Sequence, residues 1–242
     1  ISLTHNWATD CYDSYNNTGN SIRKNSYAPK DILDWISKYE KARGDYDWGI
    51  AAHPYPIGTT SSNPTKTDPS WSGKNGNPDP ITGDWKTSPW ITAANLELYQ
   101  LYFEQPENKY NGTELRTVSL TETSICNLDE DSVSADKYLT SVYEQAASVA
   151  QYYYRAAHID CIDEIAYFQL HDQPGYKLGL LQDDGSKKPA YDVWKYVDTN
   201  KTFNYSQKYL KYITNGTWLD IMKCTKSGFN WDLMWDESKI MV

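Results

Sequence analysis

The sequence has no long hydrophobic run, no excess of basic residues and no clustered cysteines, and each absence excludes a class of protein. No apolar stretch approaches the roughly 20 residues that cross a bilayer, so we expect no membrane span. The 32 acidic residues outnumber the 23 basic ones, for a net charge of −9. This balance argues against nucleic acid or an anionic membrane surface as a partner.

The four cysteines, Cys11, Cys126, Cys161 and Cys224, are widely spaced. None belongs to a CxxC or Cys/His pattern, so we predict no metal site and expect no cofactor. One or two disulfides are compatible with the spacing but are not required by it. Cys126 follows Glu122 closely, but no histidine neighbours it in the sequence. A structural role is therefore favoured over a nucleophilic one.

Aromatic residues form a skewed set of 21 Tyr and 10 Trp but only 4 Phe. Such amphipathic rings suit half-hydrated surfaces, including platforms that stack on sugar faces, although ordinary packing accounts for most of them. Trp71 and Trp85 stand in residues 57–87, a loop rich in Pro, Gly, Ser, Thr and Asn. Loops of this length are typical of lids, binding loops or disordered segments. We therefore select both tryptophans as candidate sugar-binding residues.

Strand-like apolar runs alternate with segments whose apolar residues have helical spacing. The runs end at Asn6, His53, Glu122 and Asp172. The predicted helices cover residues 31–39, a segment opening at Ser88-Pro89 and reaching Tyr102, residues 135–158 and residues 188–197. Such alternation indicates parallel strands with right-handed crossover helices. The predicted fold class is α/β, of the (β/α)8 TIM-barrel type, with this chain supplying the last four βα units.

We expect residues 1–200 to form this half-barrel and residues 201–242 to form a C-terminal extension that packs on it. Within the extension, Tyr209–Ile213 is a candidate short element, while Trp218, Trp231 and Trp235 follow no clear period. The chain opens at Ile1 inside a strand-like run and shows no signal-peptide pattern, so we expect a cut or processed N-terminus.

The residues at the strand ends form an ordered set of motifs. These are His5-Asn6-Trp7, His53-Pro54-Tyr55-Pro56, Leu120-Thr-Glu122-Thr-Ser and Gln169-Leu-His171-Asp172, followed by Lys188-Pro-Ala-Tyr. In this order they resemble the last four strands of clan A glycoside hydrolases, and more closely a poorly characterised bacterial family of glycosidase-like barrels. The resemblance covers roughly residues 1–200, which makes it more specific than any single motif.

The resemblance implies that Glu122, at the end of the seventh barrel strand, is the nucleophile. It places His53 and Tyr55 where side chains support that nucleophile. The acid/base of the clan belongs to an Asn-Glu pair, and no such pair occurs in this sequence. Asp172, Asp10 and Asp13 are the carboxylates near strand ends that could substitute, although a hydrogen-bonding role toward the sugar is favoured for each.

We therefore predict a retaining glycoside hydrolase acting on a polysaccharide or oligosaccharide, with Asn6, Trp7 and Asp172 holding the sugar. The alternative is a non-catalytic carbohydrate-binding module with a barrel fold. A third expectation is pairing with the missing half-barrel or with a second copy, because four strands leave open edges. The location implied by the resemblance is extracellular or at a bacterial cell surface.

Overall fold

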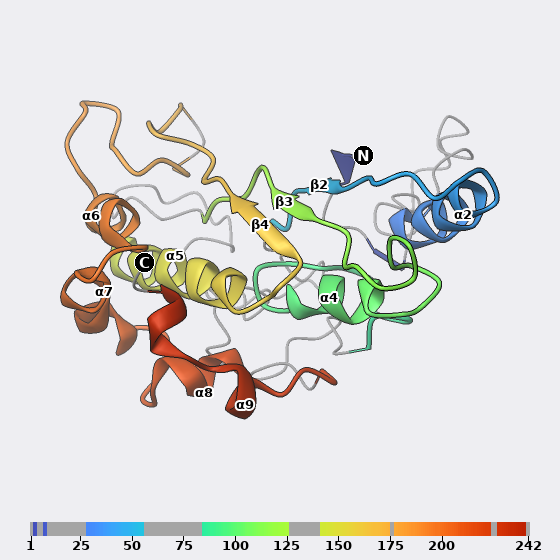
Figure 1. The fold of residues 1–242 in the computed structure, drawn as a ribbon. Coiled ribbons are helices and arrows are strands. Elements are labelled where there is room, and N and C mark those ends of the chain that lie inside the picture. Colours follow the sequence, from blue (N-terminus) through green and yellow to red (C-terminus); the bar gives the residue numbers. More distant parts are fainter. Residues whose placement is uncertain are drawn as a thin grey trace.

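A parallel sheet of four short strands runs through the centre of the molecule (Figure 1). The computed structural model describes residues 2–3, 7–8, 28–55, 84–125, 141–174, 177–223 and 227–240. Within these residues the sheet order is β1 (Ser2–Leu3), β2 (Ile50–Ala52), β3 (Val118–Leu120) and β4 (Ile162–Ile165). Every neighbouring pair is parallel, so the predicted consecutive, parallel strand order is confirmed.

The register places the ends of the strands side by side. Ala52 of β2 lies opposite Leu120 of β3, and Leu120 lies opposite Ile165 of β4. A register shift between Val118 and Ser119 leaves one extra residue on β4. The structure therefore shows a mixed α/β fold around a small parallel sheet. That this sheet is the second half of a (β/α)8 barrel stays a prediction.

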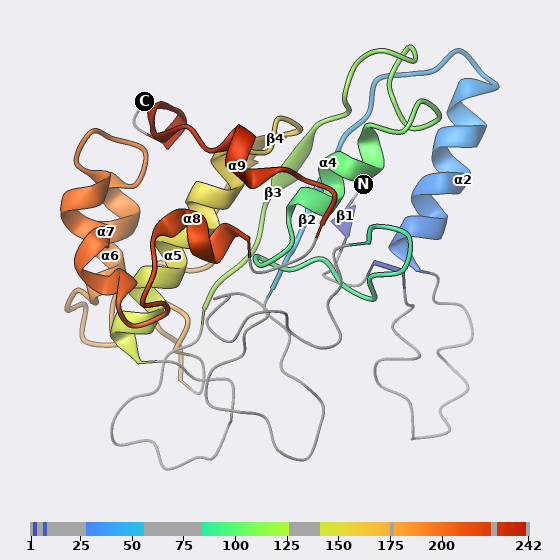
Figure 2. The same cartoon turned by 90° about the horizontal axis from the view of Figure 1, so that it is seen from below.

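A helix follows each strand, and the first three of these helices connect one strand to the next. They are α2 (Pro29–Lys41), α4 (Glu97–Phe103), α5 (Val142–Ala157) and α6 (Pro189–Tyr196). Helices α4 and α5 lie on one face of the sheet, below it in Figure 1 and in front of it in Figure 2. The core between them and the sheet includes Val118, Leu120 and Val149, which are all fully buried.

Helix α5 begins where its sequence caps it. Ser141 has an extended backbone, and its side chain accepts a hydrogen bond from the Glu144 amide. The Glu144 carboxylate in turn accepts from the Ser141 amide, which completes a capping box. The helix therefore begins at Val142, later than residue 135, where the apolar period alone placed its start.

The prediction that a helix opens at Ser88-Pro89 is wrong. The carbonyl oxygens of Ser88 and Pro89 accept hydrogen bonds from the amides of Ala8 and Trp7, at 3.1 and 2.8 Å. This pairing holds the segment against the chain that follows β1, and the Ser88 hydroxyl donates to the Trp90 carbonyl rather than capping a helix. Helix α4 starts eight residues after Pro89, at Glu97.

The C-terminal residues fold into short helices that pack on α5. They are α7 (Thr202–Leu210), α8 (Trp218–Met222), α9 (Trp231–Met234) and the 3-10 helix η2 (Glu237–Ile240). Helices α7 and α8 and the 3-10 helix all contact α5. The candidate element at Tyr209–Ile213 is the end of α7 and the turn that follows it. The division of the chain at residue 200 stays a prediction.

A buried polar cluster on α5 holds this extension. Arg155 pairs with Glu97 of α4 at 2.9 Å and donates to the carbonyls of Ile221 and Met222 in α8. The Tyr154 hydroxyl lies 2.8 Å from the Ser206 hydroxyl of α7. His158 stacks on Trp235, with ring centroids 4.6 Å apart. Of the helices in the described ranges, none has the length and apolar character needed to span a bilayer.

Candidate active site

Three residues that the sequence predicted for the site, His53, Tyr55 and Glu122, lie together at the carboxyl ends of β2 and β3. His53 directly follows β2, and its amide donates to the Leu3 carbonyl of β1 at 2.9 Å. Pro54 ends the strand because it has no amide to donate to the ladder. Its carbonyl instead accepts from the Thr123 hydroxyl at 3.1 Å, which ties the end of β2 to the segment carrying Glu122.

The Glu122 carboxylate is held from the neighbouring strand. The Tyr55 hydroxyl donates to Glu122 Oε1 at 2.6 Å, and His53 Nδ1 lies 3.7 Å from Oε2. The first distance is that of a charge-assisted hydrogen bond, whereas the second is an electrostatic contact without hydrogen-bond length. The Glu122 side chain is 36% exposed and that of His53 is 26% exposed. One carboxylate oxygen is therefore fixed by a hydrogen bond, while the side chain as a whole remains partly exposed.

Tyr55 stays a neutral hydrogen-bond donor over the physiological range. Partial burial, and then the hydrogen bond to Glu122 and its negative charge, raise the pKa of the Tyr55 hydroxyl well above its ordinary value. The phenol therefore keeps its proton where an exposed tyrosine would begin to lose it. This arrangement fixes the direction of the carboxylate rather than neutralising it.

The backbone beyond Glu122 is fixed by contacts from α5 and from the segment that follows β4. The Thr123 carbonyl accepts from the Phe168 amide at 2.8 Å. The Ile125 carbonyl accepts from the buried Gln145 side chain at 2.8 Å, and the Ile125 amide donates to the Tyr167 hydroxyl at 3.3 Å. These contacts limit the movement of the Glu122 segment from both sides.

Sequence reasoning did not assign a site role to Tyr167 or Phe168. Phe168 is 39% exposed, and its backbone pairs with Thr123, so this aromatic residue lies beside the segment that carries Glu122. The signal was present as two consecutive aromatic residues near the end of the fourth strand-like run. We add Phe168 to the candidate substrate-contacting residues.

Asp172, predicted to hold the sugar, is buried in an ion pair. Its side chain is 1% exposed, and Oδ1 lies 2.6 Å from the Lys188 ammonium. The Gly179 amide donates to the same oxygen at 2.7 Å. A Cβ at Gly179 would lie 2.3 Å from the Asp172 amide nitrogen, so only glycine fits. In this arrangement Asp172 ties the segment after β4 to Gly179 and Lys188 rather than facing a ligand.

Trp7 and Trp85, the other predicted sugar contacts that the structure describes, lie against the core. Trp7 is 1% exposed, and its ring meets the edges of Tyr99 and Tyr102 at 5.7 and 5.1 Å. It therefore has no ring face for a sugar. Trp85 is half-buried, meets Tyr102 at 5.5 Å and lines a separate pocket.

Several other predicted residues lie outside the described ranges. They are Asn6, Asp10, Asp13, Trp71 and three of the cysteines, Cys11, Cys126 and Cys224. Cys161 is a buried free thiol whose pKa is raised by burial, so it is not a reactive nucleophile. Among the described residues, no group of three or more His, Cys, Asp or Glu side chains could hold a metal ion.

Comparison with known proteins gives a structural likeness and a family. A family 39 glycoside hydrolase from the gut symbiont Bacteroides cellulosilyticus WH2 matches with 19% identity and a TM-score of 0.38, over 66% of this chain. The chain spans 29% of the length of that structure. No curated protein matches the sequence. The pattern of the family of unknown function DUF5722 matches residues 1–221, and the chain belongs to this family.

Proposed function

We propose that Glu122 is the nucleophile of a retaining glycoside hydrolase site that acts on a polysaccharide or oligosaccharide. The observation that carries this proposal is the 2.6 Å hydrogen bond from Tyr55 to one Glu122 oxygen, in a side chain that remains partly exposed. The two residues come from the carboxyl ends of adjacent parallel strands, where α/β folds place their active sites.

In the proposed reaction, Glu122 Oε2 attacks the anomeric carbon as the bond to the leaving oxygen breaks. A glycosyl ester forms on Glu122, and water then displaces it to restore the carboxylate. Tyr55 holds Oε1 so that the attacking oxygen keeps its direction. His53 Nδ1 lies 3.7 Å from Oε2 and would help to orient this oxygen. Phe168 would border the sugar ring.

The leaving oxygen also needs a proton from a second carboxyl group about 5 Å from the nucleophile. Asp172 does not fit this role, because Lys188 and Gly179 take up its one hydrogen-bonded oxygen inside the protein. The proposed acid/base therefore comes from a part of the natural protein other than the described residues, or from a second chain. The proposed location is outside the cell or at a bacterial cell surface, where polymeric sugars occur.

The burial of Asp172 is also the observation that favours the second candidate function, a non-catalytic carbohydrate-binding module. Such a module would use the same rim, with Glu122 and His53 as hydrogen-bonding partners of sugar hydroxyls. It would bind a polysaccharide without releasing reducing ends. The two functions therefore differ in turnover and not in ligand class.

The test uses the full-length natural protein and a panel of plant and microbial polysaccharides, with release of reducing sugar as the readout. Replacement of Glu122→Ala should lower turnover by roughly 10⁴-fold or more, as loss of a nucleophile does. Added azide should restore part of the rate and give a glycosyl azide of inverted anomeric configuration, detected by mass spectrometry and NMR. Azide replaces the missing carboxylate, and no merely structural residue would respond to it.

Glu114→Gln is the matched control, because Glu114 is an exposed carboxylate at the turn preceding β3. It should leave turnover unchanged. Wild-type activity in Glu122→Ala would overturn the nucleophile assignment. Tight polysaccharide binding with no turnover by the wild-type protein would establish the binding module instead.

A further inference from the structure

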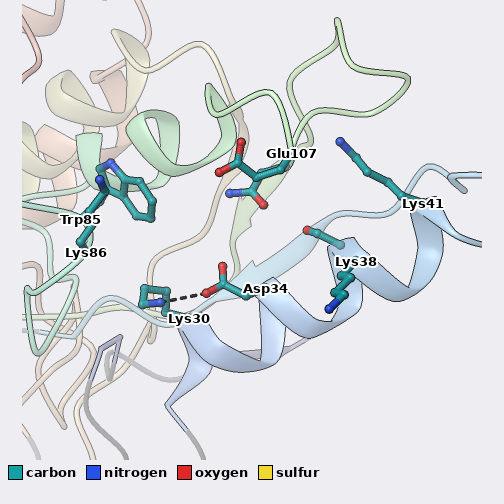
Figure 3. Close-up of a pocket in the computed structure, with 9 residues that line it drawn as sticks. Lys30, Asp34, Lys38, Lys41, Trp85, Lys86 and Glu107 are labelled. Carbon is teal, nitrogen blue, oxygen red and sulfur yellow. Dashed lines mark hydrogen bonds and ion pairs between the residues drawn. The ribbon is translucent and has the colours of Figure 1, made fainter.

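A pocket of about 620 Å³ opens between α2 and the turn that follows α4 (Figure 3). This volume is that of an ordinary small-molecule site. It shares no lining residue with the cluster around Glu122. The residues that line it are Lys30, Asp34, Ser37, Lys38, Lys41, Trp85, Lys86, Glu107 and Asn108.

One side of the pocket is an aromatic ring. Figure 3 shows Trp85 facing Asp34 and Glu107 across the pocket, with Lys41 beyond them. The Trp85 ring packs edge-on against Tyr102, with the ring centroids 5.5 Å apart. The Trp85 backbone carbonyl accepts a hydrogen bond from Trp7 Nε1 at 2.6 Å, so the residue is held in place. A fixed, half-buried ring loses little freedom when a ligand stacks on it.

The polar groups of the pocket are already oriented by the protein. Asp34 accepts from the Tyr102 hydroxyl at 2.9 Å and from the Lys30 ammonium at 2.8 Å. Lys41 donates to the Pro106 carbonyl at 2.7 Å. A carboxylate has about four acceptor sites and an ammonium has three donors, so both Asp34 and Lys41 retain hydrogen-bonding capacity.

The Ser37 hydroxyl and the Glu107 carboxylate add further capacity for hydrogen bonds to a ligand. The Ser37 hydroxyl is buried, with 2% of the residue exposed, and makes no hydrogen bond of acceptable geometry although it lies close to the Tyr102 phenol. Among the described residues, Glu107 forms no ion pair. A buried hydroxyl without a partner costs free energy unless a ligand or water satisfies it.

We propose that this pocket is a second, non-catalytic binding site for one pyranose ring of a carbohydrate chain. A pyranose presents an apolar C–H face that stacks on tryptophan, and a rim of hydroxyls that both donate and accept. Trp85 is the platform, Asp34 and Glu107 accept from hydroxyl groups, and Lys41 donates to them. The site shares the ligand class of the proposed function but does not depend on Glu122.

Lysines outnumber carboxylates in the lining, so the ring could carry a carboxylate of its own without repulsion. The probes are therefore chosen in neutral and acidic pairs. They are cellohexaose, mannohexaose and xylohexaose as neutral chains, and hexagalacturonate as the acidic chain. Binding is measured by isothermal titration calorimetry on the folded protein at two salt concentrations, because an acidic ligand would bind more weakly at higher salt.

Trp85→Ala should weaken binding by roughly tenfold or more, as removal of a central aromatic contact does. The matched control is Trp35→Ala, since Trp35 is on the same helix α2 as the pocket-lining Asp34 but is 62% exposed and does not line the pocket. It should bind as the wild type does. Because Trp85 also contacts Tyr102, Glu107→Gln serves as a second variant that leaves this packing intact. It should weaken binding about three- to tenfold, with Glu114→Gln as its control.

Glu122→Ala should retain this binding, so the pocket and the nucleophile can fail separately. Failure of all four oligosaccharides to bind the folded protein would overturn the proposal. Equal loss of affinity in the Trp35 and Trp85 variants would also overturn it. Loss of binding in Glu122→Ala alone would assign the measured binding to the strand-end site instead of the pocket.

Discussion

Two polar clusters in this molecule use similar residues in opposite ways. The open cluster, Glu122, Tyr55 and His53, lies at the ends of two strands, and the Glu122 side chain is 36% exposed. The closed cluster, Glu97, Arg155, Tyr154 and His158, lies between α4, α5 and the C-terminal helices. There the carboxylate and the guanidinium are both fully buried.

The two clusters differ in how much of their hydrogen-bonding capacity the protein itself uses. In the closed cluster, Arg155 serves a carboxylate and two carbonyls, and His158 donates to the Tyr154 carbonyl while accepting from the Asp236 amide. Such a network stabilises the packing of the extension. In the open cluster a single strong hydrogen bond directs a carboxylate whose side chain remains partly exposed. The comparison teaches that complete pairing suits a structural role, whereas the proposed function relies on incomplete pairing.

The largest expected effect is alkaline unfolding, which acts on both clusters at once. Burial raises the pKa of six tyrosine hydroxyls above their ordinary value, in Tyr55, Tyr99, Tyr102, Tyr152, Tyr153 and Tyr154. Above about pH 10 the unfolded chain loses these protons while the folded chain keeps them. The contribution of these six hydroxyls to the free energy of unfolding is therefore fully present below about pH 10 and is lost as the pH rises further.

Urea denaturation between pH 8 and pH 12 measures this loss, and absorbance at 295 nm counts the ionised tyrosines. We expect the six to ionise only with unfolding, so their absorbance change should coincide with the loss of folded structure. Smooth ionisation of all 21 tyrosines near pH 10 without unfolding would contradict the burial argument.

Arg155→Met should cost about 3–5 kcal/mol in the free energy of unfolding, because it leaves Glu97 buried without this cation. The double variant Glu97→Leu with Arg155→Met should recover part of the loss, since it removes both charges. Chemical denaturation of the three proteins checks this. A loss below about 1 kcal/mol in the single variant would show that the closed cluster is not a stabilising device.

Tyr55→Phe should lower kcat/KM of the full-length protein by roughly 10–100-fold with little change in stability. The removed hydrogen bond is to a charged group and is worth about 1.5–3 kcal/mol. The exposed Tyr46→Phe is the matched control and should have no effect. Equal kinetics for both variants would mean that Tyr55 does not orient the carboxylate.

Ser141→Ala and Thr217→Ala remove the side-chain caps of α5 and α8, and each should cost about 1 kcal/mol. Equal losses would show that α8 unfolds together with α5. A loss at Ser141 combined with none at Thr217 would show that the extension frays separately, and the closed cluster would then be weaker than its burial suggests.

The sequence predicted the features that depend on local pattern and on the geometry of parallel strands. Apolar runs stopped by Pro54 or by polar residues identified the strands, and the shared edge of parallel strands brought His53 and Tyr55 to Glu122. The catalytic roles of these residues stay predictions.

The errors have one physical origin, which is contact between distant parts of the chain. Asp172 is buried because Lys188, 16 residues later, reaches it. Ser88 is a residue type that often caps helices, but its carbonyl accepts a hydrogen bond from the Ala8 amide. The short helices at the C-terminus are stabilised by packing against α5 rather than by their own period.

The register of the sheet has a consequence for how this protein can change. Glu122 meets Tyr55 because Ala52 and Leu120 are paired in the register, and each side chain follows its strand closely, Tyr55 three residues after Ala52 and Glu122 two residues after Leu120. One residue inserted within β2 or β3 would shift the chain beyond it relative to the partner strand, so the hydroxyl and the carboxylate would no longer meet. Single substitutions in the segments after β2 and β3 thus change the site locally, whereas a change in strand length separates Tyr55 from Glu122. New substrate specificity can therefore be acquired through insertions in the loops beyond these residues, but not through insertions between the strands and these residues.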